Sequence, residues 1–229
     1  MIAGTGVLGL LSLLVSSCLK DTSSYVAPPT ALVTFYQASP DEPTMDLDFN
    51  TNKVNQSPLN YGDDVDYFSV YAGQRLVNFF NTGTLNAITS ATITVVPNNA
   101  YSLFLANIAS KPEVVLLTDT LSKPTPGNAS VRLVDLSPDA PNVDLVVQGG
   151  ATLVPNRTFK GYSSFTPITG KSSYTFQIVK TGTSNVLATL SNVTINSGFV
   201  YTILFDGLAT TTNAADKLNA VLITNAYFY

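Results

Sequence analysis

The chain of 229 residues contains two similar copies of one segment, and this duplication limits its fold more than any other feature. Residues 31–50 align without a gap with residues 129–148, at an offset of 98. The alignment of the two halves continues further along the chain, where Tyr101 of the first half corresponds to Tyr201 of the second. Matches that stay in order across most of both halves indicate a tandem duplication, so each half must build a core of its own.

Both halves consist of short runs rich in Val, Ile, Thr, Phe and Tyr, with turn signals roughly every 8–12 residues. This pattern predicts an all-β fold, with two tandem immunoglobulin-like β-sandwich domains. We expect the first sandwich over 31–121, a linker over 122–128 and the second sandwich over 129–229. Prolines stiffen the linker, so the two sandwiches are expected to stand end to end with limited bending.

Cys18 is the only cysteine, and it ends an apolar run that begins at Ile2. An apolar stretch, small residues and then one cysteine resemble a bacterial lipoprotein signal. The resemblance implies that residues 1–17 are removed, that Cys18 receives acyl chains such as palmitate, and that 18–30 form a flexible tether. No Lys or Arg precedes the run, which points to a start codon assigned too late. An uncleaved membrane anchor and a buried core helix are the alternatives.

A lipid anchor would place the protein in the cell envelope, attached to the outer membrane. Lys20 and Asp21 resemble in part the short export tags of surface lipoproteins in one Gram-negative phylum. Two matching residues leave both the periplasmic and the surface face of that membrane open.

Composition excludes several functions. The net charge is −4, whereas nucleic-acid binders carry basic patches, so no nucleic-acid partner is expected. The chain has no histidine, which removes Ser-His-Asp and Cys-His catalysis and the commonest zinc ligand. Glu42 and Glu113 are the only glutamates, and no phosphate-binding loop is present. We therefore expect neither an enzyme nor a cofactor.

A Ser-Pro-Asp-x-Pro motif follows the first expected strand of each half, and an aspartate begins the next strand. Proline cannot donate to a strand ladder, and Ser and Asp side chains can bond nearby backbone amides, so a compact structural turn accounts for the motif. The functional alternative makes the turn the lip of a binding site. The candidate residues are Ser39, Pro40, Asp41 and Asp46, and in the second half Ser137, Pro138, Asp139 and Asp144.

These residues resemble the family called domain of unknown function 4397, in close form over 137–144 and in a looser form over 39–46. The resemblance covers nearly all of 31–227, as two copies. It implies an immunoglobulin-like domain of bacterial envelope and secreted proteins, with no established activity. The first copy departs from the pattern by inserting acidic residues around 61–66.

Two further signals allow two interpretations each, and a third marks a candidate modification site. Acidic residues cluster in the first half and suggest either a Ca²⁺ site or a solvated rim: Asp41, Glu42, Asp46, Asp48, Asp63, Asp64 and Asp66. The 11 Tyr and 12 Phe are expected mostly in the cores, although tyrosines on loops could stack on sugars. Thr120, between Asp119 and Leu121, resembles a three-residue bacterial O-glycosylation site.

Taken together, the sequence predicts a non-catalytic, lipid-anchored envelope protein that acts as an adhesion or surface-complex binding module. The alternative is a carbohydrate-binding accessory lipoprotein of a nutrient-uptake system. Either role implies a protein or glycan partner at the cell surface, and the oligomeric state stays open.

Overall fold

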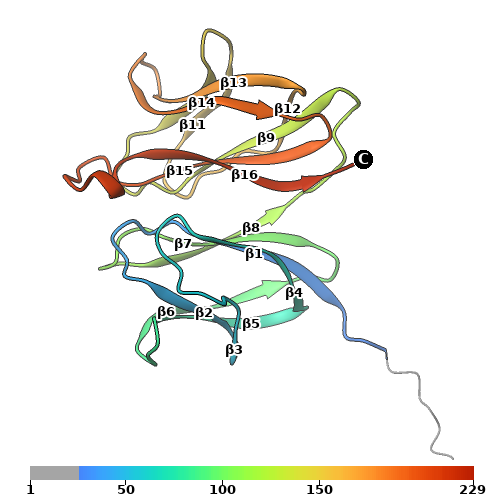
Figure 1. Ribbon diagram of the computed structural model, residues 1–229, viewed down its shortest axis with the longest axis vertical. Helices are drawn as coiled ribbons and strands as arrows, with labels where there is room; N and C mark the ends of the chain where they lie inside the picture. The colour runs from blue at the N-terminus through green and yellow to red at the C-terminus, as the bar shows by residue number, and fades with distance from the viewer. Residues whose placement is uncertain (1–25) are drawn as a thin grey trace, which may run out of the picture.

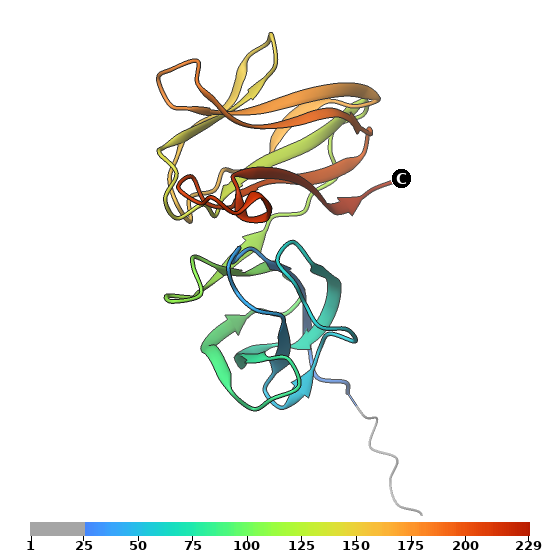
Figure 2. The same cartoon turned by 60° about the vertical axis from the view of Figure 1, so that its left-hand side comes forward.

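The computed structural model describes residues 26–229, and its strands form two β-sandwiches, one above the other in Figures 1 and 2. The predicted all-β class with two sandwich units is confirmed. Cys18 and most of the expected tether lie outside the described residues. A single turn of 3₁₀ helix, η1 (Ala214–Asp216), is the only helix in the described part of the chain, and no helix there is long and apolar enough to cross a membrane.

The first sandwich contains the strands β1 (Thr30–Gln37), β2 (Met45–Phe49), β3 (Asn52–Lys53), β4 (Asp64–Tyr71), β5 (Gly73–Asn81), β6 (Ala87–Val95), β7 (Ala100–Ala106) and β8 (Glu113–Asp119). The second contains β9 (Asn128–Asp135), β10 (Val143–Val147), β11 (Thr152–Arg157), β12 (Thr166–Thr169), β13 (Ser172–Lys180), β14 (Val186–Ile195), β15 (Phe199–Asp206) and β16 (Asn219–Tyr227).

The two halves have the same topology. In the first half a sheet ordered β4-β1-β7-β8 packs on a sheet ordered β3-β2-β5-β6, and the second half repeats this as β12-β9-β15-β16 on β11-β10-β13-β14. In both halves the first strand runs parallel to the seventh, and the other pairings are antiparallel. The first strand therefore lies inside its sheet, unlike the ABED and CFG order of constant immunoglobulin domains.

Each sandwich closes its own apolar core, as the duplication requires. Phe35 and Phe79 lie with ring centroids 5.6 Å apart in the first core, and Phe176 and Phe205 are fully buried in the second. Six of the twelve phenylalanines are buried: Phe35, Phe49, Phe79, Phe104, Phe176 and Phe205. Tyr101 and Tyr201 close equivalent turns, because their hydroxyls accept the amide hydrogens of Val96 (3.0 Å) and Asn196 (3.2 Å).

A third apolar cluster joins the two halves. The outer faces of β4-β1-β7-β8 and β12-β9-β15-β16 pack against each other, which makes a molecule of four sheet layers (Figure 1). Phe104 of the first half and Leu204 of the second are 2% and 0% exposed in this cluster. The expectation of sandwiches standing end to end is wrong, because β1, β7, β9 and β15 carry apolar side chains on both faces and must be covered on both.

Candidate functional site

The Ser-Pro-Asp-x-Pro turn ties the end of the first strand to a loop far away in the sequence. In the first half, the Asp41 carboxylate accepts the amide hydrogen of Ala109 at 2.8 Å. In the second half, Asp139 accepts those of Ala209 at 2.7 Å and Thr210 at 3.0 Å. These bonds outweigh the cost of burial and hold the pKa of Asp139 below its usual range. The aspartate of the motif therefore fastens the loop that follows the seventh strand.

The second aspartate of each motif fastens the next hairpin. Burial by itself would raise the pKa of Asp46. Its carboxylate pairs with the ammonium group of Lys53 at 2.7 Å and accepts the amide hydrogen of Gly83 at 3.1 Å. These contacts bring the pKa of Asp46 below its usual range. Asp144 accepts from the Thr181 hydroxyl at 2.6 Å. Since Gly83 and Thr181 lie in equivalent hairpins, both carboxylates perform the same structural task.

The serines and prolines complete the turn. Ser39 and Ser137 are fully buried, and the Ser137 hydroxyl donates to the Gly207 carbonyl at 2.7 Å. Pro40 and Pro138 follow just after strands β1 and β9 have ended. The aspartates, Ser137 and the two prolines are thus engaged in holding the sandwiches, and a compact structural turn accounts for them.

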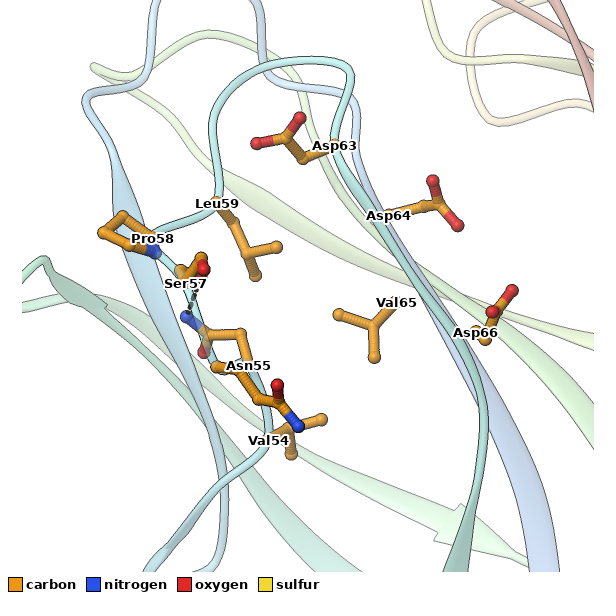
Figure 3. A pocket seen from close by; sticks show the side chains of 10 residues that line it. Val54, Asn55, Ser57, Pro58, Leu59, Asp63, Asp64, Val65 and Asp66 are labelled. Atoms are coloured by element: carbon orange, nitrogen blue, oxygen red, sulfur yellow. Dashed lines mark hydrogen bonds between the residues drawn. The ribbon is translucent and has the colours of Figure 1, made fainter.

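A groove opens at the edge of the first sandwich, under the loop that joins β3 to β4 (Figure 3). Its volume is about 550 Å³. Leu59 and Val65 point into the groove, whereas Asp64 and Asp66 point away from it, toward the second sandwich (Figure 3). Among residues 26–229, no three His, Cys, Asp or Glu side chains come together closely enough to hold a metal ion. The acidic residues of the cluster differ in exposure, because Asp46 is buried in the turn described above whereas Asp64 and Asp66 are exposed.

A second cavity lies between the two sandwiches, on the side of the linker; we call it the interdomain cleft. It has a volume of about 410 Å³ and is lined by Thr118, Thr120, Ser122, Arg132, Tyr162, Ser163, Ser164 and Phe165. Thr118 lies in β8, Thr120 and Ser122 lie in the connection from β8 to β9, and the last four all precede β12. Hydroxyl groups and two aromatic rings thus surround one arginine, at a boundary between domains where ligand sites are common.

Arg132 is neutralised within the interface. Its guanidinium lies 2.7 Å from the Asp119 carboxylate and donates to the hydroxyls of Ser102 (3.0 Å) and Thr202 (2.8 Å). It also lies over the ring of Phe165, 4.7 Å from the centroid. The Arg132 side chain is 2% exposed and that of Asp119 is 0% exposed. The cleft therefore presents a rigid, polar and uncharged wall.

Tyr162 supplies the exposed ring of the cleft. It is 48% exposed, although the loop that carries it is fixed by the neighbouring Ser163, whose amide donates to Leu133 O at 3.0 Å and whose hydroxyl accepts from Leu133 N at 3.1 Å. An exposed aromatic ring on a fixed loop, beside several hydroxyls, suits a ligand that has both apolar and hydroxyl-bearing surfaces.

A buried carboxyl lies elsewhere in the same interface. Asp206 of the second half is fully buried near the hydroxyls of Tyr36 and Tyr61 of the first half. Burial raises the pKa of Asp206 to about 7, against the opposing effect of the two tyrosine hydroxyls. The first half has Ala106 at the equivalent position, so the fold itself does not require this carboxyl.

Only Thr120 among the cleft residues was expected from the sequence to be functional, as a glycosylation candidate. The structure places Thr120 exposed just after the end of β8, on the rim of the cleft. Arg132 and Tyr162 were missed. One signal was available for Arg132, because it is the only charged side chain within the alternating run 129–134, where a buried face is expected.

Comparison with known proteins identifies a family. The family described as "Domain of unknown function (DUF4397)" matches residues 31–146, and the chain belongs to it. The match begins at β1 and ends within β10, so it spans the first sandwich and the beginning of the second. No curated protein matches the chain.

Two solved structures resemble the chain at low identity. One is a family CBM26 module from Eubacterium rectale Amy13K in complex with maltoheptaose, with 9% identity, a TM-score of 0.28, and coverage of 86% of this chain and 97% of that one. The other is titled "Alpha-glucan binding by a streptococcal virulence factor", with 12% identity, a TM-score of 0.25, and coverage of 78% and 92%.

Proposed function

We propose that this protein is a non-catalytic binding module that holds a neutral glycan in the interdomain cleft. The observation that carries the proposal is the pairing of an exposed Tyr162 ring with the hydroxyl groups of Thr118, Thr120, Ser122 and Ser164 around an internally neutralised arginine. A sugar has apolar faces that pack on aromatic rings and hydroxyls that bond to hydroxyls. A charged ligand would find no unpaired counter-charge on Arg132.

The test is binding of the chain from residue 26 onward, which contains both complete sandwiches, to an array of neutral and acidic glycans. Tyr162→Ala is expected to weaken binding of the captured glycan about 10-fold or more, because stacking on one ring is worth roughly 0.5–1.5 kcal/mol beyond buried area. Tyr71→Ala is the matched control, since Tyr71 is 55% exposed and lies outside the cleft. Absence of any glycan ligand, or equal loss in both variants, would overturn the proposal.

The first expectation from the sequence, adhesion or assembly of surface complexes, stands as the second candidate. The rigid interface favours it, because two sandwiches held in one orientation can present their loops as a fixed surface. Affinity capture of envelope proteins by the same fragment separates the candidates: a specific protein partner that Tyr162→Ala leaves in place supports adhesion.

The location in the cell envelope is part of the proposal. Acylation of Cys18 would anchor the protein in the outer membrane, with residues 18–30 as the tether to β1 at Thr30. The intact mass of membrane-extracted protein tests this, with a mature chain beginning at an acylated Cys18 as the expected result. Cys18→Ser should release the protein from the membrane. Protease treatment of intact cells then decides between the surface and the periplasmic face.

We also propose that the second sandwich is a second copy of the same family domain. Its support is the strand order, which repeats over eight strands, and the equivalent bonds made by Asp41 and Asp139. Expression of residues 122–229 alone tests independent folding of this copy, with a stable monomeric sandwich expected once its exposed interface face is made polar. O-glycosylation of Thr120 remains a proposal too, and the mass of the peptide from native cells would test it.

A further inference from the structure

The four sheets have eight edge strands, and most of them carry a feature that prevents further pairing. Charged or proline residues occur on β3, β4, β8, β11 and β12: Lys53, Asp64, Asp66, Glu113, Asp119, Pro155, Arg157 and Pro167. Charges, prolines and bulges are the usual means by which natural edges avoid joining other strands.

Bulges interrupt all three remaining edges, β14, β16 and β6. In β14, Ser191 and Asn192 together stand opposite Thr175, and Asn192 has a φ of 54°. In β16, Asn225 is skipped in the pairing with β15, and its side chain donates to the Tyr67 hydroxyl of the first sandwich at 3.2 Å. β16 is therefore partly covered as well as bulged.

β6 is the least protected edge, because its one bulge lies near its start, where Ile88 is skipped in the pairing with β5. Its nine residues contain no charge and no proline, and Thr89–Val95 pair with β5 in an uninterrupted register. The strand lies at the edge of the lowest sheet in Figure 1. Within residues 26–229, the backbone groups of 88–95 make no hydrogen bond other than those to β5. A row of backbone donors and acceptors is thus available along one side of β6.

We propose that β6 is a self-association edge, through which two copies of this protein pair antiparallel to form a continuous eight-stranded sheet. A second copy of the protein is the expected partner because of the residues of the strand itself. Antiparallel pairing about a two-fold axis places β6 of one copy beside β6 of the other. No register brings like charges together, because the strand has no charged residue. Exposed Ser90, Thr92 and Thr94 would face hydroxyl or β-branched partners, which are favourable cross-strand neighbours. Backbone hydrogen bonds supply the affinity, as in other cases of strand addition.

The second half provides a matched control within the same chain. Thr94 and Thr194 are equivalent, because each pairs with the second residue of the preceding strand of its hairpin, Gln74 or Ser173. Both side chains are exposed. Around these positions only β6 is regular, since the bulge at Asn192 disrupts β14 two residues before Thr194. The same substitution at the two positions therefore separates an edge effect from a general effect of added charge.

The experiment is sedimentation velocity of residues 26–229 from about 10 µM to 1 mM, because a single strand pair buries a small area and gives a weak interface. A dimer fraction that rises with concentration is expected, with at least a 10-fold weaker association in Thr94→Lys and no change in Thr194→Lys. A monomer throughout this range, or an equal effect of both substitutions, would overturn the proposal. Thermal melting of each variant verifies that it is folded.

A second measurement locates the contact. Residues 26–229 contain no cysteine, so Thr92→Cys introduces a single thiol at the centre of the regular stretch Thr89–Val95. Under a mild oxidant it should yield a disulfide-linked dimer well above the level given by Thr194→Cys. Equal yields from the two variants would place the association elsewhere and count against β6.

Discussion

The guanidinium of Arg132 in the second sandwich lies 2.7 Å from the carboxylate of Asp119 in the first, and almost no water reaches either group. Asp119 also accepts from the hydroxyls of Ser102 (2.9 Å) and Tyr67 (2.5 Å), all within the first sandwich. Desolvating two charges is costly, and here the ion pair and the hydrogen bonds to Ser102, Thr202 and Tyr67 offset that cost. The interface is therefore specific as well as apolar.

Removing one member of this pair should destabilise the whole protein. Asp119→Ala leaves the Arg132 charge buried without a counter-charge, and we expect a loss of about 3–5 kcal/mol in the free energy of unfolding. Urea denaturation of residues 26–229 measures it. Lys160→Ala is the control, because its pair with Glu113 is partly exposed and worth at most about 1 kcal/mol. Similar losses in both variants would contradict the importance of the buried pair.

The two sandwiches should unfold together. Because the interface buries Leu204 and Phe104 as completely as either core buries its own residues, calorimetry should show one cooperative transition. Leu204→Asp puts a charge into the apolar interface, and should lower the melting temperature and separate the transition into two steps. Leu85→Asp, at a position 92% exposed, should leave the single transition in place. Two transitions in the unchanged protein would show that the halves are independent.

Stability should fall as pH rises toward neutrality, through Asp206. Its pKa is about 7 in the folded protein, against an ordinary value of 3.8, so the folded state holds the proton more tightly than the unfolded state. The contribution of this proton to the free energy of unfolding is complete below about pH 4 and is lost as the pH rises through about 7. Asp206→Asn should stabilise the protein at pH 8 and have little effect at pH 4.

Urea midpoints across this range provide the measurement, with the exposed carboxylate of Asp66, changed to Asn, as the control. Part of the dependence of stability on pH should persist in Asp206→Asn, because burial also raises the pKa of Asp135 to about 7. Equal stabilisation at both pH values would argue that the gain comes from packing and not from the proton.

The two motif aspartates should differ in their effect. Asp139 accepts two amide hydrogens and the Thr210 hydroxyl, whereas Asp41 accepts one amide hydrogen. We expect Asp139→Ala to cost about 1–2 kcal/mol and Asp41→Ala less, as measured from urea unfolding at pH 7. The difference should shrink in acid, since the bonds hold the pKa of Asp139 low and their contribution is lost when it is protonated. A larger cost for Asp41 would contradict this account.

The sandwich architecture could be predicted because its determinants are local and occur twice. Alternating apolar runs indicated strands, and the repeated motif indicated a turn after the first strand of each half. The long-range partners of Asp41 and Asp139, Ala109 and Ala209, could not be predicted, since backbone amides have no signature in a sequence.

The packing of the two halves was missed, although the chain contains a sign of it. Strands β7 and β15 are buried on both faces along almost their whole length, as their continuous apolar runs 103–106 and 203–205 would allow. Asp206 and Arg132 are without counterparts in the first half, where Ala106 and Thr34 occupy their places. Residues that differ between repeats were therefore the better guide to the interface and its cleft, and those that recur were the guide to the fold.

The short crossing from β8 to β9 makes the contact between the halves an intramolecular one. A connection of this length keeps two surfaces at an effective concentration on the order of millimolar, whatever the abundance of the protein. Proteolytic cleavage anywhere in 120–127 would remove that advantage without touching either core. The severed pieces would then have to find each other by diffusion, and on separating each would expose to water a charge that had been buried, Asp119 on one and Arg132 on the other.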